Sequence, residues 1–220
     1  MILFALVSSS AFGAQTIEGR VRQYGAAVAQ RWAPYFKRAG VAYPPRSVTL
    51  VGLKQERRLE VYAADTNNML RFIRSYPILA ASGKLGPKLK EGDLQVPEGL
   101  YRIESLNPNS AFHLSLRVNY PNDEDRAQAK DDHRSNLGGD IMIHGNAVSV
   151  GCLAMGDEAA EDLFVLAALT GITNVSVILS PLDFREHDLP KLPPDAPKWT
   201  ADRYTAIKAA LAKVRKPKTY

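Results

Sequence analysis

The stretch IMIHGNAVSVGCLAM, residues 141–155, restricts the fold and the chemistry of this chain more than any other. A short apolar run ends at His144, which is typical of a buried strand that delivers a histidine at its end. Eight positions later lies Cys152, the only cysteine among the 220 residues. A thiol is activated by a nearby base or positive charge, and imidazole is the side chain that titrates nearest neutral pH. The pattern predicts Cys152 as a nucleophile and His144 as its general base and acid.

Small residues precede the cysteine, and we expect the backbone N–H groups of Gly151 and Cys152 to face the oxyanion of a tetrahedral intermediate. The group that orients the imidazole is left open: a backbone carbonyl, Ser115 or Asn146 could do so. A buried structural cysteine beside a core histidine is the alternative, and the spacing alone does not decide between the two. One cysteine and scattered histidines show no paired ligand spacing, so we expect neither a metal nor a cofactor.

Working outward, the first residues of the chain resemble a secretory signal. Residues 1–14 form an apolar run followed by small residues, with a cut after Ala11 or Gly13, although the basic start of such a signal is missing. A buried N-terminal element is the alternative, and the run is too short to span a membrane. We therefore expect an exported protein of the periplasm or cell envelope with no stable membrane span. In an oxidising compartment an unpaired cysteine is buried, paired between chains or kept for chemistry.

The overall charge points to an acidic partner without naming it. The net charge is +5 and the pI about 9.3, which would suit nucleic acid, anionic lipid or an anionic wall polymer. Export and the absence of aromatic residues between the basic residues of the tail, 213–218, argue against nucleic acid. The length suffices for one domain with a sizeable core.

The apolar periodicity predicts a mainly β domain with flanking helices, an α+β fold. Residues 16–36 have helical spacing, and Pro34 should end or kink that helix. From Ser47 the period changes to two, which predicts an antiparallel meander of three strands, followed by further strands at 100–103, 111–120, 140–144 and 174–179. Residues 121–139 read as a surface loop, residues 157–171 as a helix with Asp157 as its N-cap, and residues 201–212 as a short helix.

Four segments follow from this pattern. They are a signal at 1–14, a helix and linker at 15–46, a catalytic domain at 47–180, and a proline-rich segment with a short helix and basic tail at 181–220. Within the domain, the polar face of the strand at 111–120 could line a groove or face solvent. The lysines of the loop at 82–99 could meet an acidic substrate, although this loop lacks the spacing of a phosphate-binding loop. The candidate substrate contacts are Ser149, Asn146, His113, Ser115, Arg117 and Lys84.

The order of these motifs resembles the L,D-transpeptidases, whose catalytic unit is the YkuD domain. The resemblance rests on His-Gly followed by Ser-x-Gly-Cys-x-x-Met, and on LEVY, YPI, SGK and PEGLYRI upstream, at residues 59–62, 76–78, 82–84 and 97–103. It covers about residues 47–179. It implies a mixed β-sandwich with a helix after the catalytic cysteine.

Three stretches, GPKLKEGDLQVPEG, LNPNSAFHLSL and SVGCxAM, are similar to the YafK-like branch of that family, and the chain departs from the usual motif at two positions. Val150 stands where the family has histidine, and Ala154 where it has arginine; Arg117 or Lys84 could replace the missing cation. The resemblance implies an exported acyl-transfer enzyme that acts on diaminopimelate-containing peptidoglycan stem peptides through a Cys152 thioester. One alternative is an amidase of the same fold that releases a peptide or a wall-linked lipoprotein from diaminopimelate. Another, from a different class, is a non-catalytic peptidoglycan-binding module.

Overall fold

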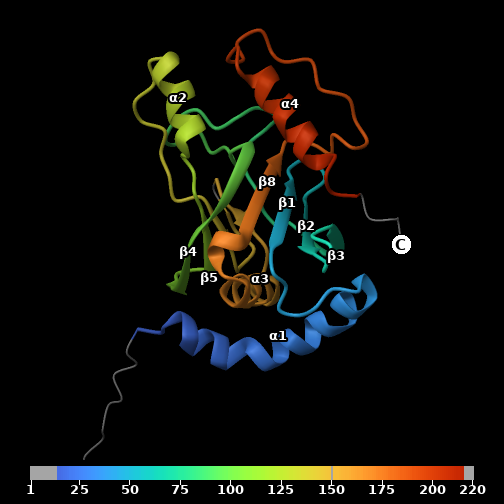
Figure 1. Cartoon of the computed structure of the whole chain (residues 1–220). Helices are drawn as coiled ribbons and strands as arrows, with labels where there is room; N and C mark the ends of the chain where they lie inside the picture. The colour runs from blue at the N-terminus through green and yellow to red at the C-terminus, as the bar shows by residue number, and fades with distance from the viewer. Residues whose placement is uncertain (1–13, 150, 216–220) are drawn as a thin grey trace, which may run out of the picture.

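The computed structural model describes residues 14–149 and 151–215 (Figure 1). Most of the predicted signal, the Val150 position and the end of the basic tail lie outside these residues. The described helices are α1 (Ile17–Ala39), α2 (Asp123–Asp131), α3 (Asp157–Thr170) and α4 (Thr200–Leu211), with a 3-10 turn at Ile172–Asn174. The strands are β1 (Val48–Leu53), β2 (Arg58–Ala64), β3 (Leu70–Pro77), β4 (Gly99–Ser110), β5 (His113–Val118), β6 (Met142–His144), β7 (Leu153–Ala154) and β8 (Val175–Ser180).

The strands form one mixed sheet in the order β3-β2-β1-β8-β4-β5-β6-β7. The β1–β8 and β6–β7 pairs are parallel, and the other neighbours are antiparallel. β4 joins the two parts of the sheet, because Gly99–Arg102 pair with β8 whereas Ile103–Ser110 pair with β5. The predicted meander and α+β class are confirmed, and α3 follows the cysteine as the resemblance implied.

A short bridge covers the outer side of β7. Ala80 and Ala154 form an antiparallel bridge, and Ala154 exchanges hydrogen bonds with the segment after β3. The N–H of Ala154 donates to the Ala80 carbonyl at 3.0 Å, and the N–H of Leu79 donates to the Ala154 carbonyl at 2.9 Å. Strand β7, at one edge of the sheet, is therefore hydrogen-bonded to the segment that follows β3, the strand at the other edge.

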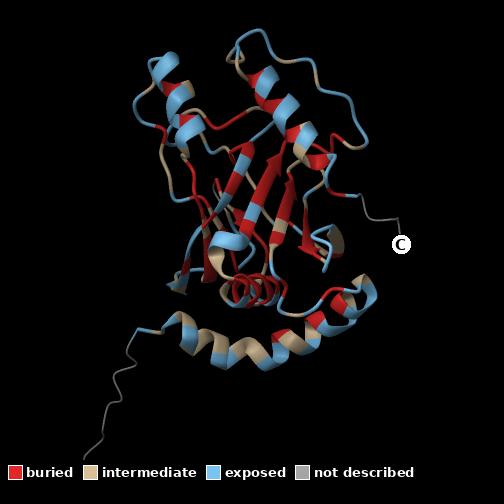
Figure 2. Ribbon diagram, viewed as in Figure 1, coloured by how far each residue is buried: buried red, intermediate tan, exposed pale blue. Residues whose placement is uncertain are grey.

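The central strands are buried on both faces, as Figure 2 shows. Successive side chains of a strand point to opposite faces of the sheet. Val48 and Leu50 of β1 accordingly belong to a core cluster with α1 and α3, whereas Val51 and Leu53 belong to a second cluster with α4. The period-two pattern therefore predicted correctly that one face of β1 is buried, but it did not predict that the opposite face is also buried. That face is covered by α4 and by the segment that precedes it.

Helix α1 begins at an N-cap, Thr16, whose Oγ1 accepts a hydrogen bond from the N–H of Gly19. It buries Trp32 and Phe36 and continues past Pro34 to Ala39, where Gly40 ends it with a positive φ of 67°. Of the two outcomes expected at Pro34, an end or a kink, the helix does not end there, and the buried Phe36 packs in the following turn. Figure 1 shows α1 as a curved helix along one side of the sheet.

Three other local predictions need correction. Residues 121–139 are not all loop, because α2 forms on a capping box in which Asn122 and Asp125 satisfy each other's backbone N–H groups. This short polar helix has no apolar stripe that periodicity could detect. β4 is longer than 100–103, since β5 pairs with its polar second half. The N-cap of α3 is Gly156 and not Asp157.

No helix within residues 14–149 and 151–215 is long and apolar enough to cross a membrane.

Candidate active site

His144 ends β6 and is fixed by backbone pairing on both sides. It lies opposite Ser115 of β5 and beside Ala154 of β7. The Met155 N–H donates to the His144 carbonyl at 2.8 Å. The residue is only 2% exposed. The strand therefore ends at a buried histidine, as the sequence predicted, and this histidine lines a cavity.

The turn after His144 leaves no room for a side chain. A Cβ at Gly145 would lie 2.6 Å from Asp157 Oδ1 and 2.7 Å from the Phe112 carbonyl oxygen. Asn146 follows with a φ of 62°, and its N–H donates to Asp157 Oδ1 at 2.7 Å. Asp157 is the first residue of α3 but not its N-cap, and its side chain links this turn to the start of the helix.

A backbone carbonyl orients the imidazole, which was one of the three possibilities left open by the sequence. The Nδ1 atom of His144 lies 2.6 Å from the Gly145 carbonyl oxygen. Because a carbonyl only accepts, Nδ1 carries the proton and Nε2 of the neutral ring is left as the basic atom. Burial lowers the pKa of His144, and the hydrogen bond to Gly145 opposes that change. The ring is therefore neutral, and able to accept a proton, near pH 7.

Cys152 lies just before β7 and contacts backbone groups of the neighbouring segment. Its Sγ accepts a hydrogen bond from the Met142 N–H at 3.3 Å and donates to the Asp140 carbonyl at 3.4 Å. Burial raises the pKa of the thiol, and the charge of Asp140 adds to this, whereas the Met142 N–H and the charge of Lys88 lower it. Among the described residues, Sγ makes no hydrogen bond to the imidazole. The resting pair is thus a neutral thiol and a neutral histidine.

Cys152 and His144 line the same cavity, which has a volume of about 440 Å³. Its walls come from the β4–β5 hairpin, the start of β6 and the segment that precedes β7. Phe112 packs against the imidazole with ring centroids 4.8 Å apart. The other lining residues are Asn107, Ser110, Ala111, Ser115, Asp140, Met142, Val148 and Ser149.

Of the six candidate substrate contacts, Ser115 and Ser149 line this cavity. His113 does not, because it has a φ of 72° next to an irregularity of the β4–β5 pairing and turns toward α1 and α3. Its Nε2 lies 3.1 Å from Glu161 Oε1, and its ring packs edge-on against Tyr24. Of the polar face of β5, which was expected either to line a groove or to face solvent, Ser115 lines the cavity and His113 does not.

The three remaining candidates also lie outside the lining. Asn146 forms the turn described above. Arg117 pairs with Glu104 Oε2 at 3.0 Å and with Asp140 Oδ1 at 2.6 Å, so it reaches the cavity only through Asp140. Lys84 lines a different cavity.

Lys88 is one of the loop lysines for which contact with an acidic substrate was considered, but its effect on the thiol was not predicted. Its charge lowers the pKa of Cys152, a role for which Arg117 and Lys84 had been considered. Lys88 is only 7% exposed, and its Nζ contacts Asp93 Oδ1 at 2.7 Å and the Lys90 carbonyl at 2.8 Å. Nothing in the local pattern of a lysine-rich loop distinguishes Lys88 from its neighbours.

Both backbone amides expected to face an oxyanion donate to serine hydroxyls. The Gly151 N–H donates to Ser82 Oγ at 2.6 Å, and the Cys152 N–H donates to Ser149 Oγ at 3.1 Å. Ser82 Oγ in turn donates to the Leu94 carbonyl at 2.7 Å. Each hydroxyl accepts the hydrogen bond that an oxyanion would take. Ser82 was missed as a site residue, although the Ser-Gly-Lys match around it was the available signal.

A half-buried thiol and a backbone-oriented histidine thus line one cavity of a mixed sheet, with a helix following the cysteine. Residues 46–177 match the L,D-transpeptidase catalytic domain, YkuD. This match covers more than half of the chain, which therefore belongs to the L,D-transpeptidase family.

Relatives support the same assignment. YafK of Escherichia coli K12, named for an inferred L,D-transpeptidase activity, is 35% identical over 133 residues, which are 58% of this chain and 51% of YafK. The chain thus spans about half the length of this relative. The cell-shape-determining protein Pgp2 of Campylobacter jejuni has the same fold, with a TM-score of 0.51 and 18% identity over 76% of this chain and 70% of Pgp2. Its K307A mutant has the same TM-score at 21% identity over 70% of this chain and 54% of that chain.

Proposed function

We propose that this chain is an exported, cysteine-dependent acyl-transfer enzyme that acts on peptidoglycan stem peptides. One observation carries the proposal: Cys152 and His144 line one cavity, with the imidazole held so that Nε2 is its basic atom. Membership of the L,D-transpeptidase family supports the substrate class. The net positive charge fits a wall polymer rich in carboxylates.

The neutral resting pair favours general-base catalysis over a preformed thiolate. As Sγ attacks the carbonyl carbon of an amide, Nε2 of His144 takes the thiol proton. The amides of Gly151 and Cys152 stabilise the oxyanion once the serine hydroxyls release them. The imidazolium then gives its proton to the leaving amine, the C–N bond breaks, and a thioester remains on Cys152. The thiol and imidazole must approach each other in the substrate complex, since they are not hydrogen-bonded here.

The second half of the reaction decides between two products. An amine acceptor that attacks the thioester gives transpeptidation, whereas water gives hydrolysis and an amidase. Ala154, in place of the family's arginine, and a cavity whose described lining has no lysine or arginine favour a different recognition of substrate carboxylates. The amidase therefore remains the second candidate.

The test uses isolated peptidoglycan fragments that contain diaminopimelate. Wild-type protein should form a covalent adduct on Cys152 and change the muropeptide profile, with new cross-links for a transpeptidase or released amine for an amidase. Cys152→Ala should abolish both effects, and His144→Gln should slow acylation by about 10² to 10⁴-fold.

Intact mass after exposure to a carbapenem supplies an independent measurement of thiol acylation. If wild-type protein binds sacculi but forms no adduct with the fragments or with the carbapenem, the chain is a binding module and the enzymatic proposal fails.

A further inference from the structure

A second cavity of about 450 Å³ lies between the loop at residues 84–95 and the segment 192–204, which includes the first turn of α4. Among the described residues it shares no lining side chain with the Cys152 cavity. Its volume lies in the range of about 300–1,000 Å³ that is typical of small-ligand sites. Neither the thiol chemistry nor the orientation of His144 requires this cavity.

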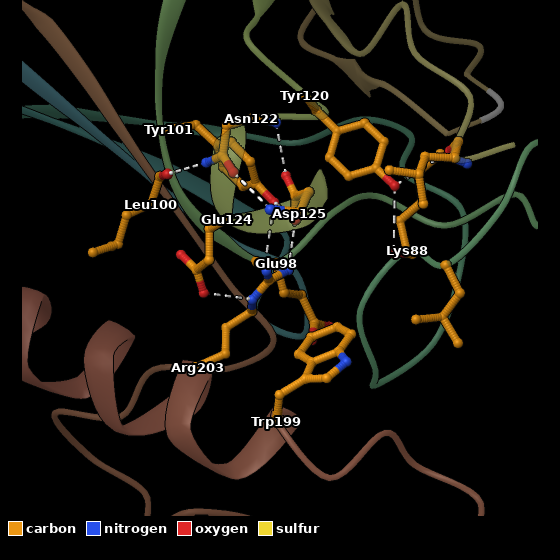
Figure 3. A network of polar contacts seen from close by, with 12 residues as sticks. Lys88, Glu98, Leu100, Tyr101, Tyr120, Asn122, Glu124, Asp125, Trp199 and Arg203 are labelled. Carbon is orange, nitrogen blue, oxygen red and sulfur yellow. Dashed lines mark hydrogen bonds and ion pairs between the residues drawn. The ribbon is translucent and has the colours of Figure 1, made fainter. Parts of the chain in front are cut away.

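The walls are held in place by buried polar contacts. Figure 3 shows Arg203 of α4 beside the carboxylates of α2: its Nη1 contacts Asp125 Oδ1 at 2.7 Å and its Nε contacts Glu124 Oε1 at 3.2 Å. Tyr204 donates to Glu98 Oε2 at 2.7 Å, and Lys54 contacts the other oxygen of Glu98 at 2.7 Å. Glu98 Oε1 also accepts a hydrogen bond from the Gly86 N–H at 3.1 Å, so the same carboxylate contacts both α4 and the loop and the cavity is preformed.

One buried hydroxyl at the start of α4 lacks a hydrogen-bond partner within residues 14–149 and 151–215, although the Thr200 N–H donates to the Pro197 carbonyl at 3.0 Å. Thr200, the first residue of α4, lines the cavity and is 0% exposed. Its Oγ1 has no hydrogen-bond partner among the described residues. The N-cap residue Trp199 makes no side-chain hydrogen bond to the helix, so backbone donors at this positive end of the helix also lack a side-chain cap. A buried hydroxyl without a partner is rare in proteins and marks a place where a ligand could supply one.

The unpaired charges of the lining are mostly positive. Arg134 is paired with Asp132, and Asp93 with Lys88. Among the described residues, Lys84 and Lys90 have no ion-pair partner, and the one unpaired carboxylate of the lining is Asp195. The remaining walls are largely apolar and include Leu85, Pro87, Leu192 and Pro193. The two lysines without an ion-pair partner in the described part of the chain, together with these apolar walls, fit a ligand that has both a carboxylate and an apolar part.

We propose that this cavity binds a carboxylate-bearing peptide segment. The carboxylate is bound by Lys84 and Lys90 and accepts a hydrogen bond from Thr200 Oγ1, while an apolar side chain packs against Leu192. The site adjoins the catalytic loop, because Gln95 lines the cavity and its carbonyl oxygen would lie 3.9 Å from a Cβ at Gly151.

The test measures peptide binding by ¹⁵N NMR on the whole chain carrying Cys152→Ala, so that turnover plays no part. Failure of the enzymatic proposal would leave this experiment unaffected. The probe is acetyl-Ala-Leu-Glu with a free carboxyl terminus, and the matched control peptide is acetyl-Ala-Leu-Gln amide. We expect saturable shifts at Gly86, Gln95 and Thr200 with the acidic peptide, and binding of the amide at least fivefold weaker.

Variants locate the contacts. Lys84→Gln with Lys90→Gln should weaken binding at least fivefold, whereas the exposed pair Lys37→Gln with Lys130→Gln should change it less than twofold. Thr200→Val should weaken binding at least threefold without lowering Tm, because the hydroxyl has no partner to lose. Equal affinity for both peptides, shifts confined to Ser115 and His144, or wild-type affinity of the double lysine variant would overturn the proposal. Inorganic phosphate that binds here as tightly as the peptide would overturn the peptide assignment.

Discussion

The imidazole of His144 is oriented by the residue that follows it, since Nδ1 lies 2.6 Å from the Gly145 carbonyl oxygen. No distant carboxylate is needed to select the tautomer. The orientation depends instead on the path of the backbone through the turn, which is set by β6 on one side and by the Asp157 contact with Asn146 on the other.

The first prediction concerns that turn. Gly145→Ala should lower the free energy of unfolding by about 1–3 kcal/mol, because the added methyl group overlaps Asp157 and Phe112. Acylation of Cys152 should slow as well, since the carbonyl that orients the ring moves. Urea unfolding and carbapenem acylation measure the two effects.

Gly25→Ala in α1 is the matched control. The nearest atom to its new Cβ is a Val21 methyl group at 3.9 Å, so the change should stabilise the helix by about 0.5–1 kcal/mol. Wild-type stability and acylation for Gly145→Ala would contradict the role of this turn.

The second prediction concerns the pH dependence of thiol reactivity. The pKa of Cys152 is raised, chiefly by burial, and that of His144 is lowered, also by burial. A raised thiol pKa means less thiolate at a given pH, so the midpoint for iodoacetamide alkylation should lie above that of a free cysteine peptide. A rate that is already at its plateau in mild acid would indicate a thiolate–imidazolium pair and exclude the neutral resting state.

The third prediction concerns Asp140, whose charge raises the pKa of Cys152. Asp140→Asn removes that charge and keeps a residue type that tolerates the φ of 55° at this position. The alkylation midpoint should shift to lower pH and the rate at neutral pH should increase. Glu104→Gln is the control, because Glu104 shares Arg117 with Asp140 but is not among the charges that shift the thiol. Equal shifts in both variants would refute a specific effect of Asp140.

The fourth prediction concerns Ser82, whose hydroxyl bridges the Gly151 N–H and the Leu94 carbonyl. Ser82→Ala should loosen the loop that presents the oxyanion amides and slow acylation about tenfold, or about 1.4 kcal/mol in the barrier. Ser135→Ala, at an exposed position, should leave the rate unchanged. Faster acylation by Ser82→Ala would contradict this supporting role and show that release of the Gly151 amide outweighs the loss of loop order.

The sequence alone predicted those parts of the molecule whose structure depends on residues close together in the chain. Alternating residues such as Leu59 and Val61 predicted β2, and the apolar run before His144 predicted β6. The motif around Cys152, together with the order of the upstream segments, led to the family. Each of these signals lies within a few neighbouring residues.

The contacts that tune the site come from far along the chain and were not predictable in this way. Ser82 reaches Gly151 across 69 positions, and Lys88 acts on Cys152 from the same distant loop. His113 was misplaced because strict alternation fails where the pairing of β4 and β5 is irregular. The burial of Val51 and Leu53 required α4, whose packing position no local pattern reveals.

The bridge between Ala80 and Ala154 has a consequence for aggregation. β7 is only two residues long and would otherwise present free N–H and carbonyl groups at the edge of the sheet, where a strand from another molecule could add. The segment after β3 already occupies that edge. Strand β7, which directly follows Cys152, is thus protected from pairing with a strand of another molecule.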